Sequence, residues 1–184
     1  CDPLVVDVAH RRPLATIEHA LYPVESTQKL ALLKHLLGEV ESASAIVFTR
    51  TKHRARKLAR QLSSSGHRAV ALQGNMSQGQ RERAMSGFRQ RRFDVLVATD
   101  IAARGIDVRQ VSHVVNFDMP NTADAYTHRI GRTGRADRQG KAYTFVTGDD
   151  HRLVSQVERR LGSKIPRRAV EGFARTPLPY ARPA

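Results

Sequence analysis

Short apolar runs alternate with amphipathic stretches along most of this chain. Residues 45–49 read Ala-Ile-Val-Phe-Thr, an unbroken run typical of a strand that is buried on both faces. Residues 52–64 then place Ala55, Leu58 and Leu62 at helical spacing, with arginine and lysine between them. The same criteria predict strands at 15–24, 45–49, 68–73, 94–99, 113–117 and 142–147, and helices at 25–40, 52–64, 78–90, 122–130 and 149–161.

The alternation of strand and helix predicts the fold class. Elements that alternate at this spacing form an α/β domain with an open, mostly parallel sheet and helices on both faces. Ligands of such sheets collect at the carboxyl ends of the strands. We therefore expect the loops after Phe48, Leu72, Thr99 and Phe117 to share one edge of the sheet with the arginine-rich stretch at 126–135.

The length of 184 residues corresponds to about one domain. Because the chain begins at Cys1 rather than at methionine, we expect residues 1–14 to be a linker or an arm from a missing N-terminal domain. Residues 15–162 carry the strand and helix pattern. Residues 163–184 contain five basic residues, four prolines and one acidic residue, Glu171. They predict a basic, proline-containing C-terminal extension that is flexible beyond Ala174.

Charge narrows the class of partner. The chain carries 31 lysine and arginine residues against 17 acidic residues, a formal net charge of +14. A pI near 11.1 implies a polyanionic partner, with nucleic acid ahead of an anionic membrane surface. No apolar run approaches the roughly 18 residues of a membrane span, and no signal peptide precedes the first strand pattern. We expect no membrane association.

Cysteine and histidine usage argues against a metal site. The single cysteine, Cys1, excludes an internal disulfide and a thiolate metal cluster, and it fits a reducing cytoplasm. His53, His67, His113 and His151 have no metal-like spacing, so we expect ordinary surface or strand-end histidines. The prediction is a cytoplasmic protein without a metal site of its own.

The stretch at 126–135 is the strongest candidate for chemistry. Arg129, Arg132 and Arg135 lie three apart and are interleaved with Gly131 and Gly134. A helix brings residues three apart onto one face, and the glycines indicate that the helix ends within the stretch. Guanidinium groups bind phosphate oxygens in pairs, so such a cluster can offset charge on a transferred phosphoryl group. Taken alone, the stretch is also compatible with a solvated basic helix end.

A second constellation follows the predicted strand at 94–99. Asp100 and Asp107 bracket the segment Asp-Ile-Ala-Ala-Arg-Gly-Ile-Asp, directly after Thr99. An acid and a hydroxyl at a strand end, with a glycine before a second acid, could bond a sugar hydroxyl and orient a neighbouring arginine. A helix cap with a surface salt bridge is the alternative.

Four motifs together resemble the second RecA-like domain of the DEAD-box RNA helicases. They are Phe-Thr-Arg-Thr-Lys at 48–52, Gln-x-x-Arg at 78–81, Ala-Thr-Asp with Arg-Gly-x-Asp at 98–107, and His-Arg-Ile-Gly-Arg-Thr-Gly-Arg at 128–135. The resemblance covers roughly residues 15–162 and implies a RecA-like sheet. Residues 164–168 (Lys-Ile-Pro-Arg-Arg) and 171–173 (Glu-Gly-Phe) resemble the bacterial RhlE branch of the family.

The resemblance implies half of a composite ATP site. Arg132 and Arg135 match the family's arginine fingers, which reach the γ-phosphate of ATP bound by the other domain. His128 and Arg129 match residues that contact that domain and couple nucleotide state to closure. The residues implied to hold or approach the nucleotide are Gly105, Asp107, Arg132 and Arg135.

The resemblance also implies RNA binding. The matching positions are Thr49, Arg50, Gly74, Gln78, Arg81, Thr99 and Asp100. Contacts of this kind reach phosphates and sugars, so binding should be largely independent of RNA sequence. Where the family commonly has His-Gly-Asp, residues 73–75 read Gln-Gly-Asn. A salt bridge from Asn75 is therefore not expected, whereas the role of Gly74 needs only its backbone.

Two absent motifs define the predicted mechanism. The sequence has no Gly-x-x-x-x-Gly-Lys-Ser/Thr and no Asp-Glu-Ala-Asp run. ATP and Mg²⁺ would be held mainly by a missing N-terminal RecA-like domain, and this chain alone would be inactive. We predict the second half of an ATP-dependent RNA helicase that unwinds short duplexes on closure. The alternatives are a non-catalytic RNA-binding platform and a DNA-directed superfamily 2 helicase domain.

Overall fold

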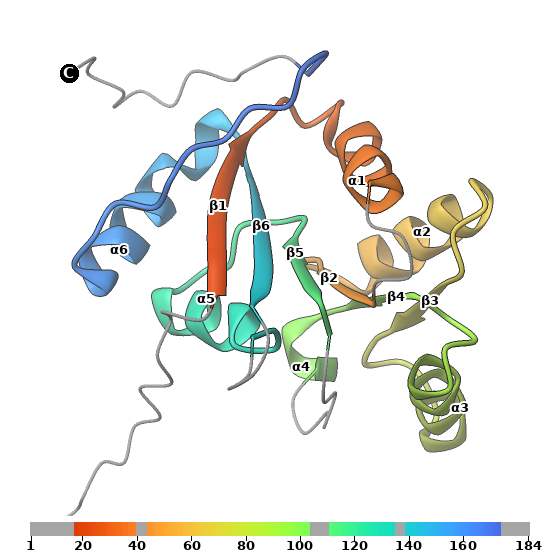
Figure 1. Ribbon diagram of the computed structural model, residues 1–184. Coiled ribbons are helices and arrows are strands. Elements are labelled where there is room, and N and C mark those ends of the chain that lie inside the picture. Colours follow the sequence, from red (N-terminus) through yellow and green to blue (C-terminus); the bar gives the residue numbers. More distant parts are fainter. Residues whose placement is uncertain (1–16, 40–43, 104–110, 135–138, 174–184) are drawn as a thin grey trace, which may run out of the picture.

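Six parallel strands form one open sheet in the order β1-β6-β5-β2-β4-β3 (Figure 1). The structure is a computed structural model that describes residues 17–39, 44–103, 111–134 and 139–173. The strands are β1 (Ile17–Pro23), β2 (Ala45–Phe48), β3 (Ala69–Leu72), β4 (Val95–Ala98), β5 (His113–Asn116) and β6 (Gly140–Val146). The parallel sheet predicted from the sequence is confirmed.

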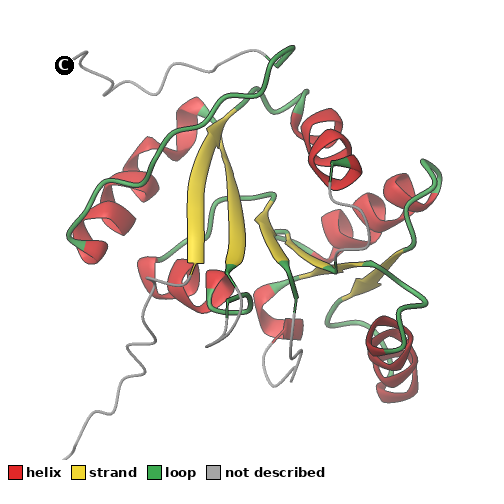
Figure 2. Cartoon of the chain, in the orientation of Figure 1, coloured by secondary structure: helices red, strands yellow, loops and turns green. Residues whose placement is uncertain are grey.

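Helices cover both faces of the sheet, as predicted (Figure 2). They are α1 (Lys29–Gly38), α2 (Lys52–Ser63), α3 (Gln78–Arg89), α4 (Asp100–Ala103), α5 (Ala123–Ile130) and α6 (His151–Leu161), with a 3₁₀ helix η2 (Gly148–Asp150) before α6. Helices α1 and α2 pack on one face and form the first core cluster with the sheet. Helices α3, α4, α5 and α6 form the second core cluster on the opposite face.

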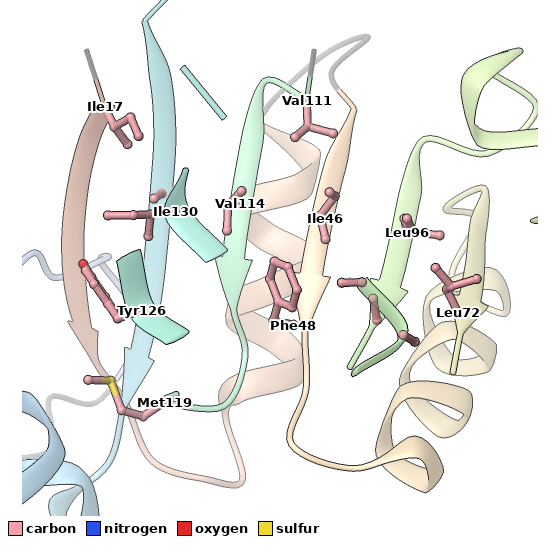
Figure 3. Close-up of a cluster of buried hydrophobic side chains, with 14 of the residues drawn as sticks. Ile17, Ile46, Phe48, Leu72, Leu96, Val111, Val114, Met119, Tyr126 and Ile130 are labelled. Carbon is pink, nitrogen blue, oxygen red and sulfur yellow. The ribbon is translucent and has the colours of Figure 1, made fainter. Parts of the chain in front are cut away.

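The two-sided cover explains why the strands read as unbroken apolar runs. In β2, Ile46 and Phe48 point into the second core cluster, whereas Val47 between them points into the first. Figure 3 shows the second cluster, in which Phe48 lies beside Ile46 and across from Tyr126 and Ile130 of α5. Each fully buried side chain of this size stabilises the fold by about 1.5–3 kcal/mol.

Helix α1 begins later and strand β6 begins earlier than the sequence predicts, and one short helix was not predicted. Helix α1 begins at Lys29, because residues 26–28 form a turn closed by the Gln28 N–H, which donates to the Glu25 carbonyl at 2.9 Å. Strand β6 begins at Gly140, where it pairs with Ile17 of β1. The short helix α4 was not predicted, because four residues are too few to show helical periodicity.

The C-terminal segment at 163–173 docks along the free side of β1. The Leu21 N–H donates to the Pro166 carbonyl at 2.8 Å, and the Arg168 N–H donates to the Leu21 carbonyl at 2.8 Å. Ile165 is buried, and the ring of Phe173 lies 5.6 Å from that of His35 on α1. This described part of the predicted extension therefore packs on the domain, while residues 174–184 lie outside the described residues.

Glu158 of α6 anchors this segment. Its carboxylate is 5% exposed, and it accepts hydrogen bonds from Lys164 at 2.9 Å, from the Ile165 N–H at 3.0 Å and from Arg167. Burial on its own would raise the pKa of Glu158, but these hydrogen bonds outweigh it and hold the pKa below the ordinary value of 4.5.

Within the described residues, none of the helices has the length and apolar character needed to cross a membrane. In the same part of the chain, no group of three His, Cys, Asp or Glu side chains is placed to hold a metal ion. His113, one of the histidines predicted to lie at the surface or at a strand end, is the first residue of β5 and is buried.

Replacing Glu158 by glutamine should lower the free energy of unfolding by about 1–3 kcal/mol at neutral pH, because the amide loses the charge that holds Lys164 and Arg167. The folded pKa lies below the unfolded value. The stabilisation is therefore present above pH 4.5 and is lost as the pH falls through the folded pKa. Urea unfolding of both proteins across this range should show a stability difference that shrinks on acidification.

Glu171→Gln is the matched control, since it removes a carboxylate from an exposed position of the same segment. Its effect should stay within about 0.5 kcal/mol. A Glu158→Gln protein as stable as the parent at neutral pH would show that the segment is not held by this carboxylate.

Candidate functional site

The loops at the carboxyl ends of the central strands are joined to one another by backbone hydrogen bonds. After β2, the Thr49 N–H donates to the carbonyl of Ala98 at the end of β4, at 2.9 Å. After β5, the Phe117 N–H donates to the Phe48 carbonyl at 3.0 Å. The edge predicted from the sequence is thus a connected layer over β4, β2 and β5.

A buried guanidinium lies beneath this edge. Arg129 of α5 is 3% exposed, and its fork donates to both carboxylate oxygens of Asp100, at 2.6 Å from Nε and 2.8 Å from Nη2. Nη1 donates to the Asp118 carbonyl at 2.8 Å and to Asn116 Oδ1 at 3.3 Å. The guanidinium carbon stands 5.1 Å from the centre of the Phe48 ring.

These contacts join four elements through one side chain. Asp100 begins α4 after β4, Asn116 ends β5, and Phe48 ends β2. Asn116 extends the network to β6, because its side-chain N–H donates to Thr144 Oγ1 at 2.9 Å. A planar, permanently charged fork meets these partners at once, which an ammonium group cannot do.

Asp118 orders the loop after β2. Its side chain is almost fully buried and accepts from the Arg50 N–H at 2.9 Å and from Arg54 Nη1 at 2.6 Å. Lys29 of α1 lies nearby, and its Nζ donates to the Phe117 carbonyl at 3.0 Å. Burial lowers the pKa of Lys29, and the negative charge of Asp118 only partly offsets this.

The seven positions implied to bind RNA differ in accessibility. Thr49 and Thr99 are buried, and the Thr49 hydroxyl donates to the Thr51 carbonyl at 3.3 Å. Arg50 is exposed, and one of its terminal nitrogens lies 4.0 Å from Asp150 Oδ1. The exposed side chains of this set extend from the β2 loop to the start of α3. The side chain of Asp100 is 42% exposed, and it accepts hydrogen bonds from the buried Arg129 beneath it.

The loop after β3 and the first turn of α3 carry three of these positions. Gly74 and Gln78 are exposed, and Gln78 donates to Glu82 Oε1 at 2.9 Å. Arg81 is half-buried and donates to the Ala102 carbonyl of α4 at 3.2 Å, which ties α3 to the loop after β4. Asn75 accepts from Lys52 Nζ at 3.1 Å, so its amide holds this lysine without a carboxylate.

The arginine-rich stretch leaves α5 as predicted. The helix ends at Ile130, and Gly131 is its C-terminal cap. Thr133 is buried, and its hydroxyl donates to the Val111 and Ser112 carbonyls at 2.7 and 2.9 Å. A Cβ at Gly140 would lie 2.2 Å from the Gly134 nitrogen, so only glycine allows β6 to pass this close.

The arginines and the histidine of this stretch take different positions. His128 is exposed and Arg132 is half-buried, whereas Arg129 is buried within the domain. Arg129 donates to Asp100, Asn116 and Asp118 of this domain, and its implied contact with another domain stays a prediction. Arg135, Gly105 and Asp107 lie outside the described residues.

Sequence reasoning missed Asn116, Asp118 and Lys29. Asp118 and Asn116 carry the same signal as Asp100, a polar side chain at a strand end. Lys29 carries no such signal, because a lysine at the start of a helix is ordinarily a surface residue. Only the fold brings it against the carbonyl of Phe117.

Comparison with known proteins identifies the family. A family model described as the helicase conserved C-terminal domain matches residues 28–137. The chain is 47% identical over 143 residues to the ATP-dependent RNA helicase SrmB of Escherichia coli, an alignment that covers 78% of this chain and 32% of SrmB. The chain thus spans about a third of the length of that relative.

Solved structures agree with this match. The E. coli DEAD-box protein SrmB, in a crystal structure with regulator of ribonuclease activity A, has a TM-score of 0.80 and 42% identity, over 87% of this chain and 96% of that chain. S. cerevisiae Dbp5 bound to RNA and ADP BeF3 has a TM-score of 0.77 and 34% identity, over 85% of this chain and 42% of that chain. The chain belongs to the helicase conserved C-terminal domain family, and it is a RecA-like domain of the DEAD-box RNA helicase type.

Proposed function

We propose that this chain is the second half of an ATP-dependent RNA helicase, which completes an ATP site when a first RecA-like domain closes on it. The observation that carries the proposal is the shared edge: Arg129 joins α5 to the loops after β4 and β5 through its hydrogen bonds to Asp100 and to the Asp118 carbonyl. The proposal also draws on the names of the relatives, which favour RNA over DNA.

In this proposal the chain contributes charge to ATP hydrolysis rather than binding the nucleotide tightly. The first domain would hold ATP and Mg²⁺, and the chemistry is the attack of water on the γ-phosphate. Arg132 and Arg135 would offset negative charge that develops on the phosphoryl oxygens. Gly105 would allow close approach of the ribose, and Asp107 would accept a hydrogen bond from it.

RNA would lie across the loops after β2 and β3. The exposed Arg50 and Gln78 and the half-buried Arg81 would meet phosphates and sugars, and their exposure supports this. The side chains of Thr49 and Thr99 are buried, so backbone groups at these positions, rather than the side chains, would contact the RNA. Such an interface reads no base edges, which supports binding that is independent of sequence.

Arg129 takes a positioning role in this proposal. Its guanidinium holds Asp100 and the carbonyl of Asp118, so it sets the loops after β4 and β5 in place. His128 directly precedes Arg129 and is exposed, so it remains the candidate for contact with the first domain. Coupling between nucleotide and RNA would then pass through Asp100 and the β4 loop.

In the full-length protein, Arg132→Ala should lower kcat of RNA-stimulated ATP hydrolysis on the order of 10³-fold, because a positioned guanidinium acts on the transition state. RNA affinity should remain close to that of the parent. Steady-state ATPase assays and RNA titrations measure both, with Arg159→Ala on the exposed face of α6 as the control. The present chain alone should not hydrolyse ATP. An unchanged kcat in full-length Arg132→Ala would show that Arg132 is not an arginine finger.

Arg129→Lys should lower the free energy of unfolding by about 2–4 kcal/mol, because an ammonium group cannot keep the fork to Asp100 and the contacts beyond it. His128→Ala, one residue away and exposed, should change stability by less than about 0.5 kcal/mol. Urea unfolding of the two variants measures the contrast. Equal stabilities would mean that the buried network contributes little to the fold.

Arg81→Ala should weaken RNA binding and flatten the dependence of log Kd on log salt by about one charge. The matched control is Arg83→Ala on the same helix, which lines a groove beside β3 instead of the RNA edge. Its salt slope should equal that of the parent. Titrations of single-stranded RNA at several salt concentrations decide the matter, and a parental slope in Arg81→Ala would exclude a phosphate contact.

A further inference from the structure

The sheet has one end that the described chain leaves uncovered. Strand β3 lies at the end of the strand order opposite to β1, with α2 and α3 on opposite faces beside it (Figure 1). A groove of about 700 Å³ runs along β3, and a shallower hollow of about 250 Å³ continues it over α2. Both are lined by Arg56, Val70 and Ala71.

The backbone of β3 offers hydrogen-bonding groups to this groove. In a parallel ladder, both backbone groups of a residue point to the same neighbour, and alternate residues point to opposite sides. The Arg68 carbonyl accepts from the Val95 N–H of β4 at 3.1 Å, so Ala69 and Ala71 face the open side. Ala69 is satisfied locally, through the His67 carbonyl at 2.9 Å and the Ser63 hydroxyl at 3.1 Å.

Ala71 is therefore the residue at which an added strand can pair. Its N–H and C=O lie in the groove, and unpaired edge groups of this kind accept a further strand. A single residue supplies two backbone hydrogen bonds. The side chains around it must supply the rest of the affinity and the selectivity.

The floor of the groove is apolar. Val70, Met76 and Phe93 are partly buried and pack against the second core cluster. The Phe93 ring packs directly against Gly87, where an added Cβ would lie 2.6 Å from the ring. The floor thus offers apolar surface to apolar side chains of a ligand.

The rim of the groove is basic. Arg56 of α2, Arg83 of α3 and Arg92 after α3 line it, and no acidic residue does so among the described residues. Among the described residues none of these three forms an ion pair, whereas the exposed Arg68 is paired with Asp94 at 2.7 Å. Charge complementarity therefore favours an acidic occupant.

We propose that the groove along β3 binds an extended, acidic segment of a partner protein, with apolar side chains on the floor and carboxylates at the arginine rim. The chain's own residues 174–184 do not fit, because they contain two arginines and no acid. A second copy of this chain is disfavoured by its net charge of +14. Single-stranded RNA prefers aromatic platforms, and the one aromatic ring in the lining, Phe93, is packed against Gly87.

The probe is an acetylated and amidated nine-residue peptide that alternates glutamate with valine. Added to the ¹⁵N-labelled chain, it should shift the backbone amides of Val70, Ala71 and Phe93. The same peptide with lysine in place of glutamate should not. In the double variant Arg83→Glu, Arg92→Glu, affinity for the glutamate peptide should fall on the order of tenfold. The lysine peptide should bind this variant although it does not bind the parent.

Ala71→Pro tests the backbone pairing separately. Proline removes only the outward N–H at this position, and edge strands tolerate proline there. Peptide affinity should fall, while amide dispersion elsewhere and RNA affinity stay parental. A glutamate peptide that leaves the Ala71 amide unshifted at millimolar concentration overturns the proposal, as does equal binding of the two peptides. Displacement of the peptide by a uridine decamer would assign the groove to RNA and overturn it as well.

Discussion

One buried guanidinium sets the arrangement on which the functional edge depends. Removing Arg129 from water costs several kcal/mol, and this cost is offset only where its N–H groups find acceptors. Asp100, Asn116 and the Asp118 carbonyl accept four hydrogen bonds from it, at the ends of β4 and β5. The loops that carry them are therefore fixed relative to α5, and a displacement of any one of them would leave a buried charge without its partner.

The rigidity of the Arg129 network matters for Arg132 and Arg50, which lie at the functional edge. A guanidinium that stabilises a phosphoryl transition state must stand within a fraction of an ångström of its place, so its support has to be preorganised. Arg132 leaves α5 three residues after the buried Arg129, on a turn pinned by Thr133 and Gly131. The Asp118 side chain gives Arg50 the same kind of support on the other side of the edge.

The sequence was sufficient for features that depend on local order along the chain. Apolar runs and helical spacing predicted the strands, the layers and the shared edge, because each signal lies within a few residues. The buried role of Arg129 could not be predicted from such local signals. Arg129 and Arg132 are both arginines of the same short stretch, and it is the order of the strands in the sheet that brings acceptors to Arg129. The docking of the segment at 163–173 escaped for a related reason. This segment is the start of a basic extension, 163–184, whose four prolines resemble a linker. The hydrogen bonds from Ile165 to Glu158 and from the Leu21 N–H to the Pro166 carbonyl that hold it appear only in the fold.

The two ends of the sheet show how the domain treats its unpaired strands. At β1 the chain covers its own edge, because Leu21 pairs with the segment around Arg167 and Glu158 holds that segment down. At β3 the Ser63 hydroxyl donates to the Ala69 carbonyl, and arginines line the edge. The backbone N–H and C=O of Ala71 nevertheless face outward. Arginines at an edge repel other copies of a basic chain, which disfavours pairing between two β3 edges and fits the acidic partner segment proposed above. In that proposal, the positive charge that suits the domain to a polyanion also selects the occupant of its open edge.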